Sequence, residues 1–174
     1  MEVESSRASA RPLNFGVSPL VKHMGKCFHR VLTVPDGPEK TSVLDDLHAC
    51  LLEARNSPYA EIWVDHGDYP SLCALVNGDR AWLMYLRYNG DAGFSSRNPG
   101  YEGPEKAVVH YYLSNGQRDE YPASWAYSTD EVFAALEWFA ANKGSPPSIT
   151  WFNDSGDGNT SPNEVSKCWI EGRG

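Results

Sequence analysis

The chain has 174 residues, of which 41% are hydrophobic and 22% are charged, and its formal net charge at pH 7 is −8. This length and composition fit one globular domain with modest tails. The negative charge argues against direct binding to nucleic acid or to an anionic membrane, because both ligands need a basic face. It suits a basic protein partner, although excess acid also simply keeps a protein soluble.

Four cysteines occur, at Cys27, Cys50, Cys73 and Cys168, and none of them forms a C-x-x-C pair. Without a neighbouring histidine motif this spacing does not predict a structural zinc site. The start of the chain lacks the pattern of a secretory signal, and no apolar run approaches the length of a membrane span. We therefore expect a cytoplasmic protein with reduced thiols and no cofactor.

The first part of the chain passes from a segment without a hydrophobic pattern to one in which apolar and polar residues alternate. Residues 1–25 show no clear hydrophobic periodicity and are expected to form a flexible N-terminal segment. From Lys26, the sequence KCFHRVLTV alternates well enough to predict a first strand. The PDGP sequence that follows, from Pro35 to Pro38, predicts a turn.

A helix is predicted after this turn, through the sequence VLDDLHACLLEAR. Thr41 or Ser42 is placed to cap its first turn. Asp45 and Asp46 are expected in that first turn, where the helix dipole favours acidic groups. The apolar residues fall on one stripe, made of Val43, Leu44, Leu47, Cys50, Leu51 and Ala54.

The middle of the chain has the pattern of a β-meander. The apolar runs EIWV, LCALV and RAWLMYL are separated by the turn sequences DHGDYP and NG. After Asn89-Gly90, residues 91–106 form a long loop rich in Gly, Pro and Ser, of a kind that is often functional. The sequence AVVHYYLSNGQRDEYP then predicts another hairpin, which turns at Asn115-Gly116.

The sequence YSTDEVFAALEWFAANKGSPPSITW, residues 127–151, predicts a capped helix, a helix stop and a short edge strand. Ser128 or Thr129 can cap the helix, and Glu131 completes a capping box with Ser128. Lys143-Gly144 and a double proline end the helix. The prediction is thus a single α+β domain over residues 26–152, with an antiparallel meander sheet and two helices on one face. A polar, partly mobile tail is expected over residues 153–174.

The most enzyme-like string is DHGD, residues 65–68. Asp65, His66 and Asp68 are residue types that can hold a metal, so a metal-dependent hydrolase is one alternative. The same composition is also typical of a turn between two strands. No GxSxG, Walker-type or strand-linked GxGxxG motif occurs. We therefore expect that the protein is not an enzyme.

Acidic residues concentrate in residues 36–68, which contain eight Asp and Glu against Lys40 and Arg55. The long loop 91–106 adds acids mixed with aromatic residues. Such a surface suits a basic protein partner through steering and aromatic anchors, although an ordinary solvated face has the same composition. The residues that we expect to contact a partner are Asp65, Asp68, Tyr69, Asp91, Phe94, Tyr101 and Glu102.

Residues 70–151 resemble the first-numbered immunity-protein family of bacterial polymorphic toxin systems. The matching pieces run in serial order: PSLCALVNGDRAWLMYL, GDAGFSS, AVVHYYLSNGQRDEYP, and the capped helix with its final Trp151. The resemblance implies a small cytoplasmic protein that binds a cognate toxin domain and covers its active site or substrate cleft. The partner in this family is often a nucleic-acid deaminase, whose positively charged cleft would match an acidic surface. A general cytoplasmic adaptor is the remaining alternative.

Overall fold

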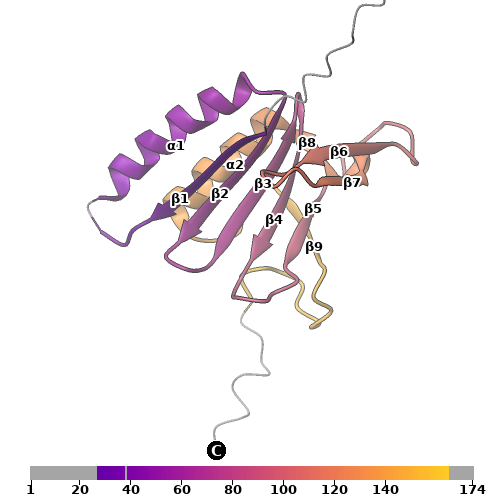
Figure 1. Ribbon diagram of the computed structural model, residues 1–174. Coiled ribbons are helices and arrows are strands. Elements are labelled where there is room, and N and C mark those ends of the chain that lie inside the picture. The colour runs from indigo at the N-terminus through magenta and orange to yellow at the C-terminus, as the bar shows by residue number, and fades with distance from the viewer. Residues whose placement is uncertain (1–26, 38, 165–174) are drawn as a thin grey trace, which may run out of the picture.

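A computed structural model of the chain describes residues 27–37 and 39–164 (Figure 1). The predicted flexible segment 1–25 and the end of the predicted tail, from residue 165 onward, lie outside the described residues. The described part is a β-sheet with two helices packed on one of its faces, as Figure 1 shows. The predicted α+β class, with two helices on one face of the sheet, is confirmed.

Twelve elements follow one another along the described chain. They are β1 (Phe28–Val34), α1 (Lys40–Arg55), β2 (Tyr59–His66), β3 (Ser71–Asn77), β4 (Arg80–Leu86), β5 (Phe94–Arg97), β6 (Val108–Tyr112), β7 (Arg118–Pro122), the short 3-10 helix η1 (Ala123–Trp125), β8 (Tyr127–Ser128), α2 (Thr129–Asn142) and β9 (Thr150–Asn153). The main sheet has the order β1-β2-β3-β4-β5-β9, and β8 pairs with β4. β6 and β7 form a separate two-stranded ribbon.

The strand directions agree with the predicted meander except at its first strand. The prediction of one long loop over residues 91–106 was wrong, because the short, serine-rich sequence FSSR has no strand pattern of its own and forms β5 by pairing with β4 and β9. β2, β3, β4 and β5 pair antiparallel in chain order, and β9 forms an edge beside β5, as predicted for SITW. β1 instead pairs parallel with β2, with Val31 opposite Trp63. The antiparallel prediction was wrong here because α1 connects the two strands. A helix of this length is a crossover that returns the chain in the same direction.

α1 begins earlier than predicted. Its first residue is Lys40 and its N-cap is Glu39, whose side chain makes no capping hydrogen bond. The prediction that Thr41 or Ser42 caps the helix was wrong, because both lie inside the first turn. A backbone hydrogen bond from Lys40 N to Gly37 O (3.2 Å) satisfies the first amide of the helix.

The early start also moves the acidic pair of α1. Asp45 and Asp46 lie beyond the first turn, contrary to the prediction, and both are exposed. The predicted apolar stripe is confirmed, with its members either buried or packed against the core: Leu47, Cys50, Leu51 and Ala54 are buried, and Val43 and Leu44 are partly buried. α1 therefore contributes its apolar side to the core and leaves an acidic side exposed.

α2 has the predicted capping box. Ser128 Oγ accepts a hydrogen bond from Glu131 N (3.3 Å), and Glu131 Oε2 accepts one from Ser128 N (3.0 Å). The helix ends at a left-handed residue, as the Gly144 stop predicted, but that residue is Lys143, with φ 56°. Lys143 N donates to Phe139 O (2.9 Å) and so satisfies one of the last helix carbonyls.

The sheet has a hydrophobic core on each side. The larger core lies between the sheet and the helices, and its largest fully buried residues include Phe139, Leu47, Ile62, Leu72, Leu83 and Leu136. A smaller core lies on the other face, where Cys73, Leu75 and Trp82 of the sheet are buried against Tyr111 of the β6–β7 ribbon. No helix among the described residues is long and apolar enough to cross a membrane.

Candidate functional site

The side chains of the DHGD string do not converge. His66 is buried on the helix side of the sheet, where its Nε2 lies 2.8 Å from Phe139 O. Asp65 lies on the opposite face because successive strand residues alternate, and Asp68 is exposed in the turn. Within residues 27–37 and 39–164, no group of three His, Cys, Asp or Glu side chains is placed to hold a metal ion. The geometry therefore gives the metal-dependent hydrolase no support.

His66 has a structural role instead. Burial lowers the pKa of His66, and this effect outweighs the hydrogen bond to the Phe139 carbonyl, which raises the pKa. The neutral imidazole therefore donates from Nε2 to Phe139 O, and its ring packs edge-on against the Phe139 ring at 4.8 Å. These contacts tie the end of β2 to α2.

Two of the expected contact residues, Phe94 and Asp91, are buried by the chain itself. Phe94 is 0% exposed and belongs to the helix-side core. The Asp91 side chain is also 0% exposed and is paired with Arg87. Neither side chain is accessible to a partner in this conformation. Asp91 lies in the connection between β4 and β5, and Phe94 is the first residue of β5, so both support the fold from inside.

Arg87 joins Asp91 to Asp157 in an ion-pair cluster that we call the Arg87 clasp. Arg87 Nε and Nη2 donate to the two carboxylate oxygens of Asp91 (2.8 and 2.7 Å), and Nη1 donates to Asp157 Oδ2 (2.6 Å). Hydrogen bonds to Asp91 raise the pKa of the Arg87 guanidinium further. Asp157 also accepts from Asn153 Nδ2 (2.7 Å). The clasp thus holds residues 154–157, at the start of the predicted mobile tail, against the domain.

Three other expected contact residues lie together at one end of the sheet. Asp65 is half-buried, and burial raises its pKa more than a hydrogen bond with Ser71 lowers it. Asp68 is exposed and Tyr69 is half-buried in the turn between β2 and β3. The loop that carries Asp91 lies at the same end of the sheet. Ser71, which follows the β2–β3 turn, pairs with Leu86, which ends β4 shortly before Asp91.

The last two expected contact residues, Tyr101 and Glu102, lie at the opposite end of the sheet. They follow Arg97, the last residue of β5, and β5 runs away from the turn that contains Asp68. Tyr101 is half-buried and its hydroxyl donates to Pro104 O (3.2 Å), whereas Glu102 is exposed. The structure therefore divides the expected contact residues between two ends of the sheet.

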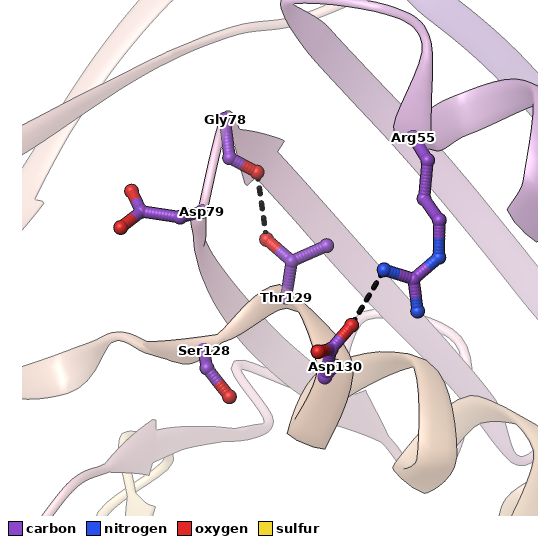
Figure 2. A pocket seen from close by; sticks show the side chains of 6 residues that line it. All are labelled: Arg55, Gly78, Asp79, Ser128, Thr129 and Asp130. Atoms are coloured by element: carbon purple, nitrogen blue, oxygen red, sulfur yellow. Dashed lines mark hydrogen bonds and ion pairs between the residues drawn. The ribbon is translucent and has the colours of Figure 1, made fainter.

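A shallow pocket lies where α2 begins, and Figure 2 shows the residues that line it: Arg55, Gly78, Asp79, Ser128, Thr129 and Asp130. Thr129 Oγ1 donates to Gly78 O (2.8 Å), and Arg55 Nη1 pairs with Asp130 Oδ1 (2.5 Å). These bonds join the end of α1, the β3–β4 turn and the start of α2. The Arg55, Ser128, Thr129 and Asp130 side chains that line the pocket are therefore engaged in contacts that hold the fold together.

A second candidate surface was missed from the sequence. We call the face of the main sheet opposite α1 and α2 the open face. Strand register places one row of side chains across it: Val31, Trp63, Cys73, Met84, Ser95 and Phe152. Val31 and Phe152, on the two edge strands, are 49% and 52% exposed, and Trp63 and Met84 are half-buried. The alternation of EIWV and RAWLMYL was the available signal, but it does not say which face stays uncovered.

The surface charge of the described residues is strongly acidic. Residues 27–37 and 39–164 contain twenty Asp and Glu against nine Lys and Arg, a net charge of −11. Most of these cations are already matched by ion pairs within the chain: Arg30–Glu53, Arg55–Asp130, Arg87–Asp91, Arg97–Asp154, Arg118–Glu120 and Lys143–Asp36. The charge that this part of the chain presents to a partner is therefore mainly negative.

Comparison with known proteins now gives the family. The family described as Immunity protein Imm1 matches residues 30–153, which run from β1 to β9 and include both helices. The match is more than two thirds of the chain and contains the whole stretch in which the sequence resemblance was found. A comparison with curated proteins finds no match. The chain belongs to the Imm1 family of immunity proteins.

Proposed function

We propose that this immunity protein neutralises a basic, nucleic-acid-acting toxin domain, in particular a nucleic-acid deaminase, by covering its active site or substrate cleft in the cytoplasm. Family membership makes the chain an immunity protein with a cognate toxin as its partner, and suggests a role without catalysis of its own. The observation that carries the finer proposal is the net charge of −11 on the described residues, most of whose cations are paired internally.

A toxin of this kind needs a basic cleft for its substrate. An enzyme that acts on nucleic acid gathers cationic groups along its substrate path, because these groups neutralise phosphates. An acidic protein is attracted to the same groups, which raises its association rate and favours docking over the cleft. Once docked, it excludes the nucleic acid without any chemical step.

As contact residues we propose Asp65, Asp68 and Tyr69, which lie together at one end of the sheet. Tyr101 and Glu102 lie at the other end and are proposed as a separate contact. Asp91 and Phe94 support the fold from inside and are not proposed to touch the toxin.

The experiment measures the association rate with the toxin domain encoded next to the gene for this chain, at several salt concentrations. The double substitution Asp65→Lys and Asp68→Lys should lower the association rate and reduce its dependence on salt. Asp45→Lys with Asp46→Lys makes the same charge change on the exposed side of α1 and is the matched control. Equal effects of the two pairs would show that general acidity, not the Asp65–Asp68 end, guides the encounter.

A further inference from the structure

The open face presents apolar side chains that the described residues leave partly uncovered. The β6–β7 ribbon covers the part of this face that contains Leu75 and Trp82. Val31 and Phe152, at the two edges of the same face, are about half exposed. At the β1–β2 side of this face the exposed Val31 lies beside the half-buried Trp63, and Asp65 lies on the same face of β2; apolar and aromatic side chains next to a charged group are typical of a protein contact site.

Trp63 lies on β2, next to the edge strand β1, where it is half-buried, packs against the smaller core and is held in a fixed orientation. Its Nε1 donates to Glu61 Oε1 (2.9 Å), and the other carboxylate oxygen of Glu61 accepts from Ser114 N (2.6 Å). The Glu61 carboxylate therefore links β2 to the β6–β7 turn, and its hydrogen bond with Trp63 holds the indole ring in one orientation. A tryptophan held in this way offers a ring surface at little cost in side-chain entropy.

Asp65 lies two residues after Trp63 on the same face of β2. Side chains at this spacing are about 6.6 Å apart, which is within the length of one lysine or arginine side chain. Asp65 is half-buried, and burial raises its pKa, so the fold disfavours its charged form. A cation from a partner, placed beside Asp65, would stabilise the charged carboxylate and offset the cost of its burial.

The open face already binds one cation of the chain itself. The guanidinium carbon of Arg97 lies 3.4 Å from the centroid of the Trp125 ring and 4.6 Å from that of Phe152. Arg97 Nη1 donates to Ser95 Oγ (2.7 Å), and Nη2 lies 3.6 Å from Asp154 Oδ1. An aromatic ring beside a carboxylate thus accommodates an arginine at the β5–β9 side of this face. Trp63 and Asp65 repeat the same combination on β2.

We infer that the open face is the surface on which the toxin docks, and that it takes a Lys or Arg side chain of the toxin with its stem on Trp63 and its charged end at Asp65. This inference rests on the proposed function, because the basic toxin supplies the cation. Val31, which lies opposite Trp63 in the register, would cover apolar atoms next to that side chain. Charge complementarity selects this occupant, since the described residues carry a net charge of −11.

Two variants of the open face and two matched controls test the inference. Val31→Lys places a cation at an exposed edge of the face, and Asp65→Asn removes the charge while keeping the side-chain shape. Leu52→Lys and Asp45→Asn make the same changes on α1, where Leu52 is 52% exposed and Asp45 is exposed. Thermal unfolding of all four proteins checks the fold. We expect Asp65→Asn to be no less stable than wild type, because burial penalises the charged form.

The probe is the toxin domain encoded next to the gene for this chain, carrying an inactivating substitution, and Kd is measured by calorimetry. The inference predicts that each open-face variant raises Kd by about tenfold or more, and that each control changes Kd by less than about twofold. Weakening by the α1 variants alone, or equally by all four, would overturn the inference and leave the proposed function standing. Failure of the wild-type protein to bind this toxin would overturn both.

Discussion

Replacing Asp91 by alanine should destabilise the fold far more than replacing an exposed acid. The Asp91 carboxylate is completely buried and accepts hydrogen bonds from Arg87 Nε, Arg87 Nη2 and Arg87 N, the last at 3.0 Å. Alanine would leave the Arg87 guanidinium, whose side chain is 9% exposed, without its two-pronged partner. Asp157 and Ser155 would still contact it.

The size of the effect follows from these contacts. Removing one partner of a buried ion pair costs about 3–5 kcal/mol, because the remaining charge stays buried. Since Asp157 still lies 2.6 Å from Arg87 Nη1, we expect the lower end, a loss of about 3 kcal/mol in the free energy of unfolding. For a domain of this length, such a loss lowers the melting temperature by about 10 °C.

Urea denaturation and thermal unfolding of wild type and Asp91→Ala measure this loss. The matched control is Asp45→Ala on the exposed side of α1, which should change stability by less than about 0.5 kcal/mol. The double variant Arg87→Met with Asp91→Ala should be more stable than Asp91→Ala alone, because it removes the buried cation that has lost its two-pronged partner. If Asp91→Ala loses no more stability than the control, the Arg87 clasp is not a stabilising element.

Three further outcomes are expected. Burial alone would raise the pKa of Asp91, but the hydrogen bonds from Arg87 outweigh this effect and lower the pKa. The stabilisation by the Asp91 carboxylate is therefore complete above about pH 4 and is lost as the pH falls. Between about pH 5 and pH 2, the denaturation midpoint should fall more steeply for wild type than for Asp91→Ala. Tyr111→Phe should leave the free energy of unfolding unchanged or raise it by about 1 kcal/mol, because the buried hydroxyl has no hydrogen-bond partner among the described residues; a clear loss in urea denaturation would contradict this. Ser128→Ala should lower the free energy of unfolding by about 1 kcal/mol, because it removes the cap of α2. Ser42→Ala, inside α1, should lower it by less in the same denaturation measurement, and equal losses would contradict the assigned caps.

Local patterns predicted the elements of this fold well, and their pairing less completely. The capping box at Ser128 depends on residues three apart, so the sequence reveals it directly. The hairpin around Gly78 is equally local, since Gly78 and Asp79 form the turn between Asn77 and Arg80. The parallel pairing of β1 with β2 depends on where α1 returns the chain, and no local pattern contains that information.

The candidate site was harder to predict for the same reason. Asp91 looked like a loop acid, but its partner Arg87 also binds Asp157, which is 70 residues further along the chain. Trp63 looked like an ordinary strand residue within EIWV. Its position on a partly uncovered face depends on the placement of the β6–β7 ribbon, which covers one part of the sheet and leaves another part accessible.

The most direct test of the proposed function measures the activity of the toxin domain encoded beside this chain on single-stranded nucleic acid. Purified wild-type chain is added in increasing amounts, with Asp65→Lys/Asp68→Lys as the weakened comparison. We expect that activity falls to zero at one immunity protein per toxin, and that excess nucleic acid competes with the inhibition, since both occupy one cleft. A complex that leaves the activity intact, or the absence of any complex, would contradict it.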